Sequence, residues 1–139
     1  MITEDYVSFE TAKLLKEKGF DSECDYLYVN GDIVRAQGGK CNWNKGETIF
    51  TDYKNECSAP TLQLTMKWLR EMQALNIYTR PVWKDVEVQY GDWEPAVVGY
   101  NWLVESLIDD TYSKTSTESF LTYEEACEAA IKYCLENLV

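Results

Sequence analysis

The chain contains no histidine, so any chemistry it performs must come from carboxylates, thiols, lysine or tyrosine. Catalytic triads, Cys-His pairs and His-ligated metals are therefore excluded within one chain. The best carboxylate candidates are Asp109-Asp110 and the strand pair Asp85 and Glu87, because residues i and i+2 of a strand point the same way and can share a Mg²⁺ ion. Glu105, on a predicted return strand, is the candidate third ligand. These residues support a metal-assisted hydrolase as an alternative, although a solvated strand face explains them more simply.

Other reactive groups fit no established motif. Gly38-Gly39-Lys40 resembles part of a phosphate-binding loop, but Cys41 follows where Ser or Thr is needed, and the glycine spacing is incomplete. The five cysteines are odd in number and form no Cys-x-x-Cys pair, so neither a disulfide framework nor a structural zinc site is expected. Cys127 and Cys134 are about 10.5 Å apart on a helix, too far for a disulfide. We expect buried thiols and no cofactor.

Aromatic residues are the most unusual feature of the composition, with 5 Trp and 10 Tyr. Such side chains serve cores, interfaces and stacking sites equally well. Trp68 falls on a helical apolar stripe and is expected in the core. Trp43 lies between two asparagines, while Trp83 and Trp93 have charged neighbours, so all three are expected to be exposed. Together with Tyr90 they are the candidate binding residues.

Acidic residues outnumber basic ones by 24 to 13, which gives a net charge of -11. This balance opposes direct binding to nucleic acid, whose phosphates attract cationic surfaces. Residues 91–139 hold 10 acids and 2 bases, as expected of a solvated helix face or of a docking surface for a basic partner. Glu124, Glu125 and Glu128 lie in this region. A second alternative is thus an acidic inhibitor that mimics DNA.

Three helices are predicted to position these groups. The first begins after a Ser8 cap and ends at Gly19, and the second has Pro60 in its first turn with Ser58 as its cap. Thr122 and Glu125 form a capping box for the third helix. The buried stripe of this third helix is predicted to consist of Cys127, Ile131, Cys134 and Leu138. The buried stripe of the second helix is predicted to consist of Leu62, Met66, Leu69 and Met72.

The strands are predicted from alternation and turn residues. Two short runs around Asn30-Gly31 indicate a hairpin, because this pair accepts the positive φ angles of a type I′ turn. Residues 82–90 alternate as a strand does. The other predictions are a loop at 37–47, a short strand at 49–51, a turn at 91–95, a return strand at 97–107, a turn at Asp109-Asp110 and a ragged edge strand within 111–121.

The order of these elements predicts a single α+β domain over residues 1–139. We expect one antiparallel sheet of four or five strands with the three helices packed mainly on one face. No run of about 18 apolar residues is present, and the first residues lack the pattern of a secretory signal. A cytoplasmic protein without membrane contact is therefore expected.

Three segments resemble a group of small uncharacterised proteins of gut Bacteroidales and their phages and mobile elements. The segments are 6–20, 57–71 and 122–139, which correspond to the three predicted helices. The resemblance implies a bacterial or phage-borne accessory protein and carries no assigned activity. With no enzyme motif present, the leading hypothesis is a non-enzymatic interaction module that binds a protein partner or itself. An open edge strand would favour dimerisation.

Overall fold

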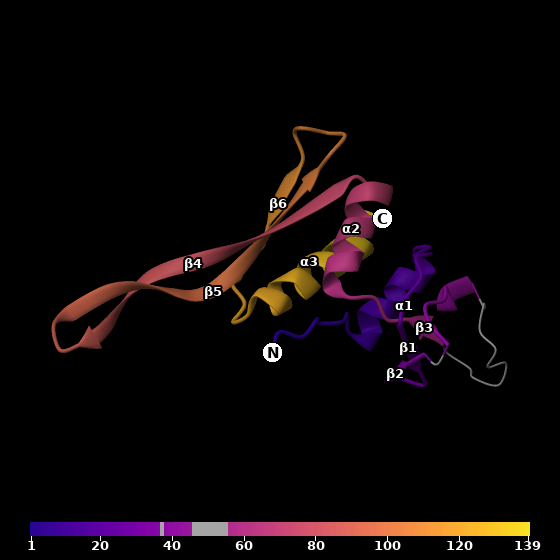
Figure 1. Ribbon diagram of the computed structural model, residues 1–139. Coiled ribbons are helices and arrows are strands. Elements are labelled where there is room, and N and C mark those ends of the chain that lie inside the picture. Colours follow the sequence, from indigo (N-terminus) through magenta and orange to yellow (C-terminus); the bar gives the residue numbers. More distant parts are fainter. Residues whose placement is uncertain (37, 46–55) are drawn as a thin grey trace.

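The computed structural model describes residues 1–36, 38–45 and 56–139. A body of helices and short strands carries one long β-hairpin that projects away from it (Figure 1). The elements in chain order are α1 (Phe9–Glu17), β1 (Tyr26–Val29), β2 (Asp32–Arg35), the 3-10 helix η1 (Trp43–Lys45), β3 (Cys57–Ser58), α2 (Leu62–Met72), β4 (Leu75–Gln89), β5 (Asp92–Ser106), β6 (Ser113–Thr115) and α3 (Tyr123–Asn137).

The α+β class is confirmed, but the prediction of one sheet with four or five strands is wrong. The described strands form two antiparallel three-stranded sheets, of order β2-β1-β3 and β4-β5-β6. The short β3 pairs with β1, so that both edges of β1 are occupied. In the second sheet β4 and β5 form a hairpin, and β6 pairs with the other edge of β5. Along the chain, α2 lies between β3 of the first sheet and β4 of the second. The β1–β2 hairpin and the β4–β5 hairpin therefore belong to two separate sheets.

All three helices begin at a local side-chain cap, and in two of them the cap is the predicted residue. Ser8 Oγ accepts a hydrogen bond from Thr11 N at 3.2 Å, and Thr122 Oγ1 accepts one from Glu125 N at 3.1 Å, as predicted. The predicted Ser58 cap is wrong, because Ser58 is buried in β3 and pairs with β1. Thr61 caps α2 instead, accepting from the backbone N–H of Leu64 at 3.1 Å.

The core lies where α3 packs against α1, α2 and the β4–β5 sheet. Cys127 and Cys134 are buried on α3, as predicted. On α2 the apolar stripe ends at Leu69, since Met72 at the last helical residue is exposed, contrary to prediction. Trp68 is buried with its ring centroid 5.5 Å from that of Phe20, which confirms its predicted core position.

The first hairpin is confirmed at its turn. Asn30 and Gly31 have φ angles of 50° and 88°, which a type I′ turn requires of both central residues. The ragged edge strand is confirmed in part, as β6 and as a backbone pairing of Phe120 with Tyr100. The predicted strand at 49–51 lies outside the described residues, as does part of the loop at 37–47. No helix in the described parts of the chain is long and apolar enough to cross a membrane.

The second hairpin is longer than predicted, with its turn at Tyr90-Gly91 rather than 91–95, because its two prolines do not interrupt the ladder. The N–H groups of Tyr100 and Phe120 each donate to the other residue's carbonyl at 2.7 Å, so the polar backbone of Tyr100 faces away from β4. Pro81, opposite Tyr100, therefore loses no bond to β5. The same alternation places Pro95 in a second non-hydrogen-bonded pair. Each proline removes one donor from an outer edge of the hairpin.

Candidate binding surface on the β4–β5 hairpin

The helices cover only the base of the long hairpin. Thr79 Oγ1 lies 3.3 Å from Cys127 Sγ of α3, and the ring of Tyr100 lies 6.1 Å from that of Tyr123 at the start of this helix. Beyond this level the two strands continue without α3, as Figure 1 shows. We call residues 82–98 the arm.

Strand alternation assigns each arm side chain to one of two faces. Thr79 contacts α3, so Trp83, Asp85 and Glu87 of the same strand point to that side, which we call the helix-side face. The register adds their partners on β5, which are Val97 opposite Trp83, Pro95 opposite Asp85 and Trp93 opposite Glu87. The opposite face carries Val82, Lys84, Val86, Asp92, Glu94 and Ala96.

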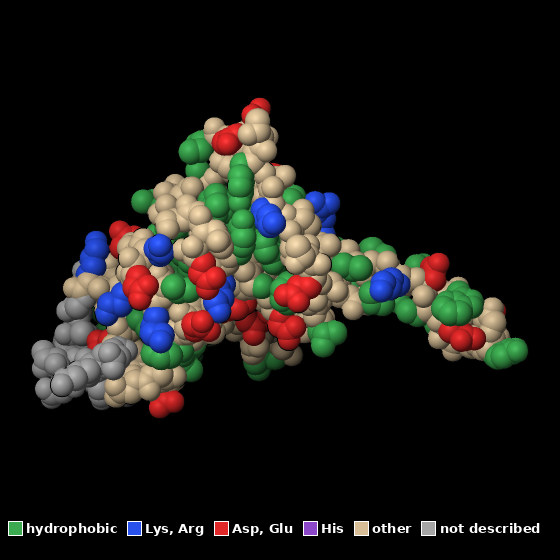
Figure 2. All heavy atoms as spheres, turned by 180° about the vertical axis from the view of Figure 1, so that it is seen from behind, with side chains coloured by type: hydrophobic (Ala, Val, Ile, Leu, Met, Phe, Trp, Pro, Cys, Tyr) green, Lys and Arg blue, Asp and Glu red, His purple; other side chains and the backbone are tan. Residues whose placement is uncertain are grey.

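The helix-side face exposes two large indoles. Trp83 is 61% and Trp93 63% exposed, and Tyr90 at the turn is fully exposed. Hydrophobic side chains follow the arm to its tip (Figure 2). Given the size of an indole, the two tryptophans offer on the order of 250 Å² of surface to a partner. Three of the four predicted binding residues are thus brought together on one element.

Trp43, the fourth predicted binding residue, is not exposed. It is 4% exposed, and its indole N–H donates to the carbonyl oxygen of Cys24 at 2.9 Å. The two neighbouring asparagines, which suggested that Trp43 is exposed, instead form hydrogen bonds to the backbone. The side-chain amides of Asn42 and Asn44 donate to the backbone oxygens of Asp21 and Phe20 at 2.7 and 3.0 Å. Trp43 therefore belongs to the core.

The three carboxylates proposed for a metal do not meet. Asp85 and Glu87 share a face, but Glu105 pairs with Asn76, ten residues along β5 from Pro95. At about 3.3 Å per residue this separates Glu105 from the pair by roughly 33 Å. The described residues contain no cluster of three or more His, Cys, Asp or Glu suited to a metal. The metal-assisted hydrolase built on these residues is thus not supported.

Thiol chemistry is disfavoured by burial. Burial raises the pKa of Cys24 and of Cys134 to about 12, and that of Cys57 to about 11. It also raises the pKa of Cys127. A thiol attacks as its thiolate, and these groups stay protonated near neutral pH. The buried cysteines therefore act as small apolar side chains.

Glu56 is a buried carboxylate that the sequence did not single out. It is 7% exposed, its Oε1 has no hydrogen-bond partner among the described residues, and burial raises its pKa, opposed by the nearby charge of Lys16. A raised folded-state pKa gives stability that is present below the unfolded pKa of about 4.3 and is lost as the pH rises through the folded value.

We expect Glu56→Gln to raise the free energy of unfolding at pH 7 by about 1 kcal/mol, because no charge is then buried. The gain should shrink as the pH approaches 4, where the wild-type carboxyl is protonated. Urea unfolding of both proteins across this range measures it. A gain that is the same at every pH would contradict an ionisation origin.

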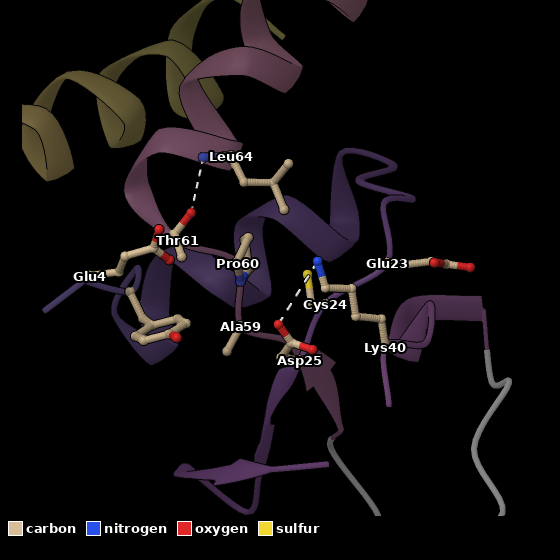
Figure 3. Close-up of a pocket in the computed structure, with 10 residues that line it drawn as sticks. Glu4, Glu23, Cys24, Asp25, Lys40, Ala59, Pro60, Thr61 and Leu64 are labelled. Atoms are coloured by element: carbon tan, nitrogen blue, oxygen red, sulfur yellow. Dashed lines mark hydrogen bonds and ion pairs between the residues drawn. The ribbon is translucent and has the colours of Figure 1, made fainter. Parts of the chain in front are cut away.

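A hollow of about 240 Å³ is lined in part by Lys40, the last residue of the Gly38-Gly39-Lys40 segment. Its rim is acidic, with Glu4, Glu23 and Asp25, and Lys40 Nζ lies 4.0 Å from Asp25 Oδ2 (Figure 3). A phosphate placed here would meet the acidic side chains of Glu4 and Asp25. The Gly-Gly-Lys segment thus forms a surface turn with an exposed ion pair.

The acidic row at the start of α3 is only partly free. Glu124, Glu125 and Glu128 line a hollow of about 510 Å³, but Glu128 Oε1 accepts hydrogen bonds from Ser8 N at 3.0 Å, Ser8 Oγ at 2.6 Å and Thr11 Oγ1 at 2.6 Å. Glu128 thereby joins α3 to the capped start of α1. Two exposed glutamates remain, which is a small surface for imitating a phosphate backbone.

No protein-family model, curated protein or solved structure matches the chain.

Proposed function

We propose that the protein is a non-enzymatic interaction module that binds a protein partner through the helix-side face of its arm. The observation that carries this proposal is the exposure of Trp83 and Trp93 on one face, beyond the reach of the helices. Tryptophan is enriched among the residues that dominate binding energy at interfaces. A standard interface buries about 800 Å² per partner, so the two indoles would supply its apolar centre.

The prolines favour docking on the face over strand addition at an edge. Pro81 removes a donor from the outer edge of β4, and Pro95 removes one from the outer edge of β5. An added strand would lose a backbone hydrogen bond at each of these positions. The dimerisation by edge pairing that the sequence suggested is therefore the weaker proposal.

The resemblance of the three helix segments to small proteins of gut Bacteroidales and their phages points to a bacterial partner. Tagged protein is therefore tested by chemical crosslinking in a Bacteroidales lysate and mass spectrometry. We expect a stoichiometric partner whose crosslinks map to the arm. An accessory role in a phage or mobile element is part of the same proposal.

The double substitution Trp83→Ser with Trp93→Ser tests this role of the arm. Because both side chains are exposed, we expect little change in stability and at least about a tenfold loss of captured partner. Tyr78→Ser is the matched control, since Tyr78 is an exposed aromatic on the opposite face of β4. Equal capture by the wild type and both variants would refute the proposal.

A further inference from the structure

The two faces of the arm differ in charge. The helix-side face carries Asp85 and Glu87 and no basic residue, whereas on the opposite face the arm's one lysine, Lys84, accompanies Asp92 and Glu94. Neither Asp85 nor Glu87 joins an ion pair within the described residues. The backbone N–H of Gly91 donates to Glu87 Oε1 at 3.0 Å. This face thus presents negative charge for which the arm supplies no cation.

The carboxylates adjoin the two indoles. Trp83, Asp85 and Glu87 follow one another on the same side of β4 at about 6.6 Å intervals, and Trp93 stands opposite Glu87. A lysine or arginine reaching this face would meet a carboxylate and the edge or face of an indole together. A cation over an indole gains about 0.5–1 kcal/mol when exposed and about 2 when desolvated.

Other occupants fit this surface less well. In a face-to-face dimer Asp85 and Glu87 of each copy would oppose like charges, which disfavours pairing. Nucleic acid and anionic lipid carry phosphate, which a protein of net charge -11 repels. A basic protein segment, in contrast, is drawn by the whole molecule as well as by this face.

We infer that the segment bound by the arm is basic, with apolar side chains on Trp83 and Trp93 and with lysine or arginine side chains at Asp85 and Glu87. This inference rests on the proposed function and names the chemistry of the partner. It predicts binding that weakens with added salt, because the charges are screened.

The probe is a labelled synthetic peptide of about 12 residues in which pairs of valines alternate with pairs of lysines, so that each face of the extended peptide presents both kinds of side chain, and it is long enough to lie along the arm. Its binding to the 139-residue chain is measured by fluorescence anisotropy. We expect saturable binding that weakens when salt rises from about 50 to about 300 mM. A peptide with glutamate in place of lysine should not bind. Equal binding of both peptides, or no binding of the lysine peptide up to about 1 mM, would overturn the inference.

Two double substitutions distinguish the effect of this face on binding from the effect of the protein's net charge. Asp85→Lys with Glu87→Lys should weaken lysine-peptide binding at least about tenfold. Asp92→Lys with Glu94→Lys makes the same change in net charge on the opposite face, since these residues alternate with Trp93, and should leave binding within about threefold. Asp85→Asn with Glu87→Gln should also weaken binding while keeping an acceptor for Gly91, and thermal melting checks that each variant folds. Equal loss in both lysine variants would overturn the inference.

The failures of the two proposals are distinguishable. Crosslinked partner that is lost on Trp83→Ser with Trp93→Ser but kept on Asp85→Lys with Glu87→Lys would overturn the basic segment and leave the interaction surface standing. Capture that is insensitive to the tryptophan substitutions would remove both.

Discussion

Replacing Trp43 by alanine is expected to lower the free energy of unfolding by about 3–5 kcal/mol, the usual cost of truncating a buried aromatic side chain. The indole is 4% exposed, packs in the core and donates its N–H to Cys24 O. Truncation would leave a cavity and remove one of the two hydrogen bonds that the carbonyl oxygen of Cys24 accepts, the other coming from Cys41 N at 3.3 Å. Urea unfolding followed by circular dichroism measures the loss.

The matched control is Trp83→Ala, which removes the same side chain from the arm. Because Trp83 is 61% exposed, its replacement should change the free energy of unfolding by no more than about 0.5 kcal/mol. Trp43→Phe should fall between the two, since it keeps most of the apolar volume and loses the hydrogen bond. Equal costs for Trp43→Ala and Trp83→Ala would contradict the different roles of these tryptophans.

Features that depend on neighbouring residues were predictable from the sequence. Ser8 and Thr122 cap helices because a side-chain oxygen three residues before a free N–H can reach it in any fold. Asn30-Gly31 makes its turn because few residue pairs accept positive φ angles at both positions. In these cases the deciding atoms all lie within a few residues of each other.

Features that depend on distant partners were not predictable. Ser58 is an acceptable cap locally, yet it pairs with Leu27 in β1, and this pairing moves the start of α2 to Leu62. The ladder across Pro81 persists because the backbone of Tyr100 is turned toward Phe120, a partner twenty residues further along the chain. Neither outcome can be derived from the local propensity of the residues concerned.

In the candidate site, too, some features depend on neighbouring residues and others on distant partners. Exposure of Trp83 was predictable because strand alternation places it on the same face as Asp85 and Glu87. The common face of Trp83 and Trp93 depends on the cross-strand register, which places Trp93 opposite Glu87. The register also removes Glu105 from the neighbourhood of Asp85. Alternation within one strand was therefore informative, whereas the pairing of carboxylates from two strands was a guess.

Glu128→Ala is expected to lower the free energy of unfolding by about 2–3 kcal/mol. Its Oε1 accepts from Ser8 N, Ser8 Oγ and Thr11 Oγ1, and hydrogen bonds to a charged acceptor contribute about 1.5–3 kcal/mol. The carboxylate also lies at the start of α1, where the helix dipole favours negative charge. Removing it would loosen α1 from α3, and thermal and urea unfolding measure the effect.

Glu136→Ala is the control on the same helix, because its carboxylate lies 3.9 Å from Lys132 in an exposed ion pair that contributes little. We expect a change of at most about 0.5 kcal/mol there. Glu128→Gln keeps an oxygen acceptor without the charge, so its cost should fall between those of the two alanine variants. Its side-chain amide can still accept from Ser8 or Thr11, but the bonds are weaker than those to a carboxylate. If Glu128→Ala cost no more than Glu136→Ala, the shared hydrogen bonds would not hold α1 on α3, and the packing of Leu15 and Ala12 would have to do so alone.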